Sequence, residues 1–259
     1  MTEQERQIFN RSLLLMGNER MERIMQMRII VFGVGGVGSW CAESLVRNGI
    51  RHLTLVDSDV VCISNCNRQL MATTRTIGRP KVEALRERLL EINPEADIAT
   101  VEGLYNEDTA ESFHLEQYDV VIDAIDSLRE KAHLILHTTR LAHKQGGRPT
   151  LLSSMGAALK TDPTKVRVAE FWKVQGDPLA RALRNRFKRD KTMPSRKFMC
   201  VYSEEPALPN AGASELLNDG SMMFNKVQAN GSLSHITGIF GLTLAGLAVH
   251  FSLSTSRTS

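Results

Sequence analysis

The sequence predicts an α/β protein with a doubly wound, mostly parallel β-sheet and a smaller C-terminal α+β extension. Two features lead to this prediction. Short apolar runs alternate with helical patterns through the first part of the chain, which is typical of parallel strands buried between two layers of helices. A glycine-rich turn, GVGGVG, joins the first of these strands to the helix after it, as in Rossmann-like folds.

The first predicted elements are a helix and then a βαβ unit. Residues 1–27 are expected to be helical, with six candidate buried positions: Leu13, Leu14, Met16, Met21, Ile24 and Met25. The apolar run at 28–33 predicts the first strand, and a helix is expected from Val37 to Arg47, because the pair Asn48-Gly49 is a typical stop signal. Residues 52–57 (HLTLVD) predict the second strand and complete the unit.

The alternation of strands and helices continues to about residue 155. Pro80 is a typical first-turn residue, and the helical pattern after it ends at the pair Asn93-Pro94. A strand, another strand, a helix and a strand are expected next, at 96–101, 118–124, 128–144 and 148–154. Residues 1–155 are therefore assigned to one Rossmann-like domain that begins with a helical segment.

The remaining residues, 156–259, are expected to complete the fold. Their predicted elements are a strand at 165–171, a basic helix at 177–190, a loop-like segment at 203–230 and an apolar helix at 236–252. The apolar helix carries His250 and is only about as long as the shortest bilayer span, roughly 20 residues. A helix packed inside the protein is favoured over a membrane span, so no obligatory membrane contact is expected.

Composition places the chain among soluble globular proteins. Apolar residues make up 42% and charged residues 24% of its 259 residues. The four cysteines form no C-x-x-C pair, so neither a zinc ribbon nor a disulfide framework is indicated. The N-terminal sequence MTEQERQIFN is polar and lacks the apolar core of a signal peptide. Together these features predict a cytoplasmic location.

One segment is far more basic than the chain, whose net charge is only +3. Between residues 181 and 197 there are eight basic side chains and one acid, Asp190. The basic residues are Arg181, Arg184, Arg186, Lys188, Arg189, Lys191, Arg196 and Lys197. On the predicted helix, Leu179, Leu183 and Phe187 are expected to face inward and to leave the charges in solvent. The segment is a candidate contact for a nucleic-acid backbone.

The glycine-rich turn predicts a phosphate site. Its glycines, Gly33, Gly35, Gly36 and Gly38, allow a tight turn and a close approach of the backbone to a phosphate. The N-terminus of the helix that follows supplies unpaired N–H groups. Asp57 ends the next strand, where a carboxylate can accept hydrogen bonds from a ribose. These features predict a nucleotide without deciding between ATP and a dinucleotide.

Three charged residues favour ATP over a dinucleotide. Arg68, Lys81 and Asp126 lie at or just beyond the carboxyl ends of predicted strands, the edge where open α/β sheets bind ligands. An enzyme that cleaves ATP needs cations near the phosphates and a carboxylate for Mg²⁺. A dehydrogenase needs neither, so the order and spacing of these residues predict an ATP site with Mg²⁺ at Asp126.

These motifs resemble those of the ubiquitin-activating-enzyme-like superfamily, whose members adenylate carboxylates. The resemblance is carried by GVGGVGS, the S-N-x-N-R-Q run, the G-x-P-K helix start and DAIDS. Within the superfamily, DPLARALR, VYSEE and NGSLSHITGIFGLTLAG are similar to the tRNA threonylcarbamoyladenosine dehydratases, and the similarity covers residues 9–250. It implies ATP-dependent cyclisation of threonylcarbamoyladenosine in tRNA, beside the anticodon, through adenylation of the threonyl carboxylate.

The resemblance also implies roles for single residues. The four turn glycines would line the nucleotide, Asp57 would hold the ribose, and Asn65, Arg68 and Lys81 would contact phosphates. Asp126 would bind Mg²⁺, and Asp59 and Asp123 are further candidate nucleotide-binding residues. Arg11 matches an arginine that reaches the ATP of a neighbouring subunit, which implies a homodimer.

Two other functions are compatible with parts of the sequence. An adenylyltransferase would activate the C-terminus of a ubiquitin-like sulfur-carrier protein, but such enzymes often carry two C-x-x-C pairs, which this chain lacks. An NAD-dependent oxidoreductase would not need Arg68, Lys81 or Asp126. Cys62 and Cys66 flank Asn65, and an incidental role is favoured for both thiols because nothing nearby except Arg68 would activate them.

Overall fold

The computed structural model describes residues 1–212 and 230–254, with side chains to residue 251 in the second segment. A seven-stranded sheet runs through the molecule in the order β3-β2-β1-β4-β5-β7-β6. The strands are β1 (Arg28–Phe32), β2 (His52–Asp57), β3 (Asp97–Glu102), β4 (Val120–Asp123), β5 (Thr150–Ser154), β6 (Val166–Glu170) and β7 (Met199–Ser203). All neighbours pair in parallel except β6, which runs antiparallel to β7. The predicted α/β class, with a mostly parallel sheet, is confirmed.

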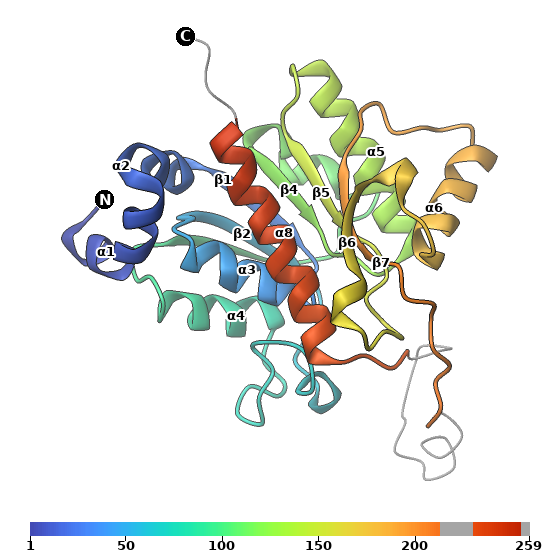
Figure 1. Ribbon diagram of the computed structural model, residues 1–259, viewed down its shortest axis with the longest axis horizontal. Helices are drawn as coiled ribbons and strands as arrows, with labels where there is room; N and C mark the ends of the chain where they lie inside the picture. The colour runs from blue at the N-terminus through green and yellow to red at the C-terminus, as the bar shows by residue number, and fades with distance from the viewer. Residues whose placement is uncertain (213–229, 255–259) are drawn as a thin grey trace.

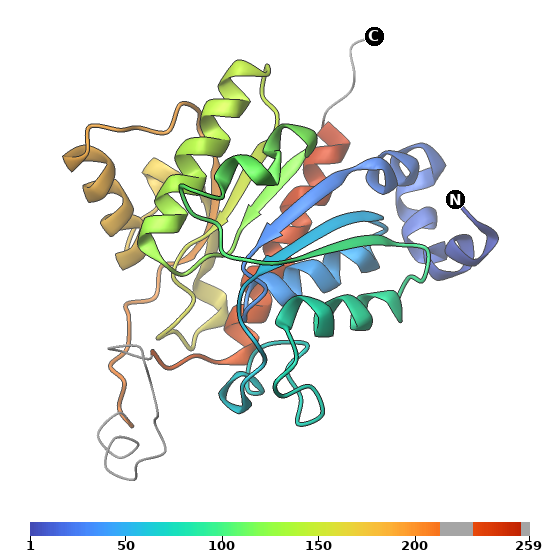
Figure 2. The same cartoon turned by 180° about the vertical axis from the view of Figure 1, so that it is seen from behind.

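Alternate residues of the central strand enter two separate cores. Ile29 and Val31 of β1 pack into one core, whereas Ile30 and Phe32 pack into the other. The first core includes side chains of α2 (Asn10–Gln26), α3 (Gly38–Arg47), α4 (Lys81–Leu90) and α8 (Ser234–Ser254). The second includes α5 (Leu128–Lys144) and α6 (Pro178–Arg189). Figures 1 and 2 show these two helical layers on opposite faces of the sheet.

The predicted N-terminal helix is two helices in the structure. Helix α1 covers Glu3–Ile8, and α2 follows after Phe9. Gly17 breaks the helical geometry inside α2, with φ of 76°. Leu14 has 80% of its surface exposed, so its predicted burial was wrong. Met21, Ile24 and Met25 are buried as predicted.

The apolar C-terminal helix lies across the sheet against α3 (Figure 1). Its side chains at Ile236, Phe240, Leu244 and Ala248 are fully buried. By length and composition, residues 234–251 are also apolar enough to cross a membrane. In this fold, one side of the helix instead supplies part of the first core.

The C-terminal elements extend the same sheet. Strand β6 was predicted, but β7 was not, since its five residues carry no periodic pattern. Strand β7 pairs with β5 on one side and β6 on the other, which places the chain after residue 155 in the main sheet. The division of the chain at residue 155 stays a prediction.

Candidate active site

A cleft of about 580 Å³ opens where the strand order reverses, between β1 and β4. Open α/β sheets bind their ligands at this switch point, beyond the carboxyl ends of the strands. The walls come from the glycine turn, the segments that follow β2, β4 and β5, and the start of α6. The predicted residues that line the cleft are Gly33, Gly35, Gly36, Asp57, Asp59, Arg68, Lys81 and Asp126.

The glycine turn is tight enough to exclude larger residues. Gly33 has φ of +83°, in the left-handed region. A Cβ atom at Gly38 would lie 1.8 Å from the carbonyl oxygen of Gly33, so only glycine fits there. Helix α3 begins at Gly38, where the Ser39 N–H donates to the Gly35 carbonyl at 3.1 Å and the positive end of the helix dipole faces the turn. The start of α3 therefore suits the binding of a phosphate.

Asp57 fixes the turn against β2. Its Oδ2 accepts a hydrogen bond from the backbone N–H of Val34 at 2.8 Å, and its Oδ1 accepts one from Asp59 N–H at 2.9 Å. The carboxylate is half-buried at the cleft wall. Each oxygen has a further lone pair, so the group can still accept a hydrogen bond from a ribose hydroxyl.

Lys81 meets the cleft from the start of α4. Its ammonium lies 2.8 Å from Asp59 Oδ2. The lysine side chain is buried, whereas the aspartate is largely exposed. A buried ammonium at the cleft wall, held by a carboxylate, is well placed to contact an anionic ligand.

Arg68 and Asp126 come from different elements and interact electrostatically. The Arg68 guanidinium donates hydrogen bonds to the Ser64 carbonyl and to Asn67 Oδ1, both at 2.9 Å. Burial lowers the pKa of Arg68, and the negative charge of Asp126 opposes that shift. The carbonyl of Arg68 accepts a hydrogen bond from Trp40 Nε1 at 3.0 Å, which holds this segment on α3.

Four predicted site residues do not line the cleft. Gly38 lies beneath the turn, and Asn65 accepts a hydrogen bond from Cys62 N–H at 3.0 Å with its side chain buried. Asp123 is fully buried, because its carboxylate binds Lys131 Nζ at 2.9 Å and Ser153 Oγ at 2.7 Å. Arg11 is exposed on α2. In this structure the side chains of Asn65 and Asp123 bond to the loops that carry Arg68 and Asp126, and their predicted contacts with the nucleotide stay predictions.

Sequence reasoning missed several residues of the cleft. Nothing in the sequence indicated that Lys131 donates to the Ile125 carbonyl at 3.0 Å, just before Asp126. Thr237 of α8 packs against Gly36 from the far end of the chain. Lys160, after β5, is also buried in the wall. No local pattern signals the contacts of Thr237 and Lys160, because they join segments that lie far apart in the sequence.

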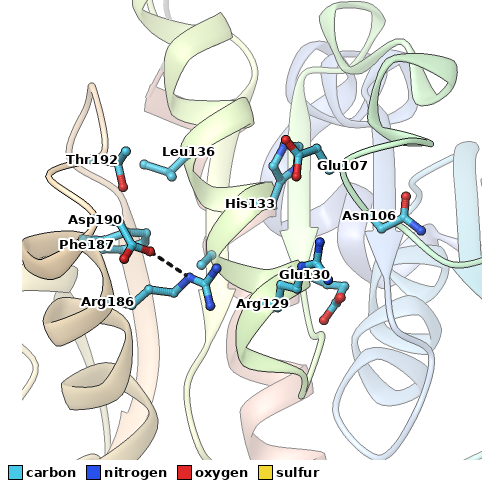
Figure 3. Close-up of a pocket in the computed structure, with 11 residues that line it drawn as sticks. Asn106, Glu107, Arg129, Glu130, His133, Leu136, Arg186, Phe187, Asp190 and Thr192 are labelled. Carbon is cyan, nitrogen blue, oxygen red and sulfur yellow. Dashed lines mark ion pairs between the residues drawn. The ribbon is translucent and has the colours of Figure 1, made fainter.

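A second cavity, of about 180 Å³, lies between α5 and α6 (Figure 3). Its lining mixes acids with bases, and Arg186 pairs there with Asp190 at 3.5 Å. It contains none of the predicted site residues. His133 lines it and meets the buried Tyr105 hydroxyl, which lies 3.1 Å from His133 Nδ1 and 3.0 Å from His137 Nδ1.

The basic segment is exposed along most of α6 and beyond, except at Arg184 and Arg186, which are half-buried. Arg181 and Lys188 are exposed. Arg184 instead turns toward the protein, where its guanidinium donates to the carbonyls of Phe171 and Val174 at 3.1 and 3.0 Å. It also lies over the Phe171 ring at 5.8 Å. The expectation that the Arg184 charge faces solvent was therefore wrong.

The four cysteines remain as free thiols. Cys41 and Cys200 are buried, and burial raises the pKa of both. Cys62 and Cys66 are exposed near the cleft. Within the described ranges, 1–212 and 230–251, no cluster of three His, Cys, Asp or Glu side chains is arranged to hold a metal ion.

Comparison with known proteins gives concordant matches. The sequence profile of the ThiF family matches residues 9–259. A tRNA threonylcarbamoyladenosine dehydratase of Bacillus subtilis is 34% identical over 93% of this chain and 92% of its own length. The Escherichia coli enzyme of that name is 34% identical over 94% of this chain and 92% of its own.

Solved structures agree with the sequence comparison. The E. coli dehydratase TcdA in complex with ATP superposes with a TM-score of 0.84 at 31% identity, covering 100% of this chain and 99% of that chain. Its AMP complex gives 0.83 at 32% identity, with 98% of each chain covered. By contrast, a molybdopterin-synthase adenylyltransferase of E. coli is 32% identical over only 52% of this chain and 54% of its own.

Proposed function

Because this chain belongs to the ThiF family, we propose that it is an ATP-dependent tRNA threonylcarbamoyladenosine dehydratase. The observation that carries the proposal is the cleft at the β1–β4 switch point. It brings the glycine turn together with Arg68, Lys81 and Asp126, side chains suited to a triphosphate. The match to the named dehydratases extends over nearly the whole chain, whereas the match to the sulfur-carrier adenylyltransferase covers about half. The dehydratase is therefore the better supported of the two.

The proposed reaction has two steps. A threonyl carboxylate oxygen attacks the α-phosphorus of ATP, the bond to the bridging oxygen breaks, and pyrophosphate leaves. The carbamoyl group of the same nucleoside then attacks the activated carbonyl and gives up a proton, the acyl C–O bond breaks, and AMP leaves with the carboxylate oxygen that had attacked the phosphorus. The net change in the nucleoside is the loss of one water. Since the nucleophile is intramolecular, the protein needs only to position the groups and neutralise charge.

The described side chains have suitable positions for these tasks. Arg68 and Lys81 would neutralise charge on the phosphates, and the N–H groups at the start of α3 would bind them as well. Asp57 would accept a hydrogen bond from the ribose. Lys131 and Asp123 hold the carbonyl and the N–H of Ile125, at 3.0 and 3.2 Å, and so fix the loop that carries Asp126.

The residues fit a magnesium ion that comes with the nucleotide. Asp126 is an exposed carboxylate at the cleft, and Mg²⁺ usually uses one or two carboxylates together with phosphate oxygens and water. Such a site needs no cluster of protein ligands. When bound, the ion supplies positive charge to the phosphates.

The proposal includes a homodimer and a cytoplasmic location. Leu14 and Leu15, close to Arg11 on α2, expose 80% and 83% of their surface, and exposed apolar patches of this kind are typical of interfaces. A second subunit seated there would bring Arg11 near a neighbouring site. ATP and tRNA are both available in the cytoplasm. A sulfur-transfer or carrier protein as partner belongs only to the alternative function.

The route of the tRNA follows from the position of α6. Pro178 and Leu179, at the start of α6, line the cleft, and the exposed Arg181 and Lys188 lie further along the same helix. An RNA with its modified nucleoside in the cleft would therefore have its flanking backbone near these charges. Sequence-independent contacts of Arg and Lys with phosphates are typical of RNA binding.

Mass spectrometry of tRNA nucleosides tests the function directly. The protein is incubated with ATP, Mg²⁺ and tRNA that carries threonylcarbamoyladenosine. We expect that nucleoside to lose one water, with AMP and pyrophosphate released. A reaction without ATP serves as control. Unchanged nucleoside in the presence of an active, ATP-bound protein would exclude the dehydratase.

A further inference from the structure

Lys160 lies in the cleft wall, on the opposite side of the glycine turn from Asp57. It follows β5, and the sheet order places β1 and β4 between β5 and β2, the strand that ends in Asp57. Only 2% of its surface is exposed. A lysine is rarely buried to this extent without a carboxylate partner.

Two other buried lysines have such a partner. Lys81 Nζ lies 2.8 Å from a carboxylate oxygen of Asp59, and Lys131 Nζ lies 2.9 Å from one of Asp123. Lys160 Nζ donates instead to the main-chain carbonyl of Glu205. Within the part of the chain that the structure describes, no carboxylate oxygen lies within ion-pair distance of it.

Two acids that interact electrostatically with Lys160, Asp177 and Glu205, are engaged with backbone N–H groups. Asp177 accepts hydrogen bonds from Gly156 N–H at 3.0 Å and Ala180 N–H at 2.8 Å. The Glu205 carboxylate accepts from the N–H groups of Thr161 and Asp162, both at 2.9 Å. Both acids act on Lys160 only through space. The ammonium thus has hydrogen-bonding capacity left for a ligand, because it carries three donors.

A buried ammonium without a bound counter-ion is unfavourable, and an anionic ligand removes that cost. The proposed reaction brings two anions to this cleft. The triphosphate has its own cations in Arg68 and Lys81 and its own N–H groups in the glycine turn, on the β1 and β2 side. The other anion is the threonyl carboxylate, and the segment after β5 offers it Lys160.

We propose that Lys160 binds the threonyl carboxylate of the substrate and orients it toward the nucleotide. The inference rests on the proposed function, and it makes Lys160 a residue that selects the modified nucleoside. Adenylation converts the carboxylate into a mixed anhydride and removes the charge that Lys160 holds. Its contact therefore favours the substrate over the activated intermediate and contributes to recognition more than to ring closure.

Binding of two RNAs tests the proposal. One is an anticodon stem-loop that carries threonylcarbamoyladenosine, and the other is the same RNA with the carboxylate converted to a carboxamide. Without ATP, the wild-type protein should bind the first roughly 10- to 100-fold more tightly, the usual contribution of a charged hydrogen bond. Lys160→Met should bind both RNAs equally, at the affinity of the carboxamide. Lys160→Arg, which keeps the charge, should keep much of the preference.

Lys165 provides the matched control, since it is exposed five residues further along the same segment. Lys165→Met should retain the full preference. Titration with ATP and Mg²⁺ distinguishes binding of the triphosphate from binding of the carboxylate. Lys160→Met should bind ATP with the affinity of the wild type. A loss of ATP affinity with the RNA preference intact would assign Lys160 to the triphosphate and overturn the proposal.

The wild-type protein alone keeps the proposal testable if Lys160→Met does not fold. A wild type that dehydrates the nucleoside but binds the carboxylate and carboxamide RNAs equally would refute the role of Lys160 and leave the function intact. If the wild-type protein neither binds ATP nor dehydrates the nucleoside, the proposed function itself is refuted.

Discussion

Arg68 and Asp126 approach the cleft from separate loops, and the charge of each affects the other. Removing either side chain should lower the dehydration rate by about 10²–10³, the usual effect of losing one preorganised electrostatic group. Single-turnover assays of Asp126→Ala and Arg68→Ala would measure this. Circular dichroism should show an unchanged fold, because both side chains are at the cleft surface.

Asp108 offers a matched control for the carboxylate. It is exposed and lies outside the cleft lining, so Asp108→Ala should retain wild-type activity. Near-wild-type turnover in Asp126→Ala would remove Asp126 from the metal role. Calorimetry of ATP binding with and without Mg²⁺ provides a second measurement. In Asp126→Ala, the gain in affinity that Mg²⁺ confers should be reduced.

His137 makes the stability of the fold depend on pH. Burial lowers its pKa, the charges of His133 and Arg140 lower it further, and Glu111 opposes the shift. The unfolded chain therefore binds a proton at His137 more readily than the folded chain does. The free energy of unfolding should fall as the pH drops below about 6.5 and level off below the folded-state pKa.

Urea denaturation at several pH values would test this dependence. His137→Gln should lose part of the decrease between neutral and acidic pH, whatever its effect on stability at pH 7. His143 is exposed on the same helix, so His143→Gln should keep the wild-type dependence. An unchanged slope in His137→Gln would assign the pH dependence to other groups.

The sequence predicted which residues line the cleft only where those residues belong to a motif. The glycine turn, Asp57, Arg68, Lys81 and Asp126 were placed correctly at the carboxyl ends of strands. Asn65 and Asp123 belong to the same motifs, but their side chains point into the protein. A motif shows that a residue type recurs beside a site, and it does not show whether that residue meets the ligand or supports the loop.

At the scale of elements, the packing of α8 on α3 depends on one glycine. A Cβ atom at Gly241 would lie 2.4 Å from the Val37 carbonyl oxygen and 2.7 Å from the Cys41 nitrogen. Gly241→Ala should therefore lower the free energy of unfolding by about 1–3 kcal/mol. It should also weaken ATP binding, because Val37 belongs to the turn that precedes α3.

Gly246 on the same helix is the internal control. It is exposed, and a Cβ atom there would meet nothing within 4 Å. Gly246→Ala should raise the free energy of unfolding by about 0.8–1.0 kcal/mol, the difference in helix propensity. If both variants change stability equally, close packing at Gly241 is not what holds α8 in place.

The outer face of α6 should determine the affinity for tRNA. Arg181→Glu and Lys188→Glu should raise the KM for tRNA and leave ATP binding unchanged. If each charge neutralises one phosphate, each reversal should also reduce the salt dependence of binding by about 0.7–0.9 in log–log slope. Filter binding over a range of salt concentrations would measure both effects.

Arg184 on the same helix should behave differently. Its hydrogen bonds go to the Phe171 and Val174 carbonyls, so Arg184→Ala should lower the melting temperature and leave the salt slope unaltered. If the Arg181 and Lys188 reversals leave the affinity for tRNA and its salt slope unchanged, the helix face is merely solvated. The RNA surface would then lie elsewhere.

Element boundaries were predictable where the local pattern is long. Residues 128–144 were predicted as a helix, and α5 covers the same span. Strand β7 was missed because its strand character depends on the neighbours β5 and β6, far away in sequence. The break at Gly17 was missed because a glycine inside a helical pattern does not by itself show a positive φ.

At the scale of the whole molecule, the proposed dimer should show complementation between defective subunits. Arg11→Ala and Asp126→Ala are each expected to have very low activity. The first removes an arginine from the neighbouring subunit's site, and the second removes a carboxylate from its own site. In a mixed dimer, one site has both Asp126 and the partner subunit's Arg11. Mixing the two variants should therefore restore part of the activity.

Subunit exchange must be confirmed by native mass spectrometry of differently labelled chains. A control mixture of Asp126→Ala with wild type should form mixed dimers and retain activity. If exchange occurs and the two defective variants stay inactive together, Arg11 does not act in the neighbouring site. A monomer in sedimentation at assay concentration would also contradict the arrangement.

The position of α8 has a consequence for synthesis. Ribosomes release β1 and its glycine turn long before α8, which is the last helix that the structure describes. Until α8 is made, the side of α3 that packs against it is uncovered, and Thr237 is missing from its place against Gly36. A chain truncated before residue 234 therefore has an exposed apolar surface and an incomplete nucleotide-binding cleft. Exposed apolar surface of this kind makes incomplete chains prone to aggregation, so we expect such a fragment to be insoluble and unable to bind ATP tightly.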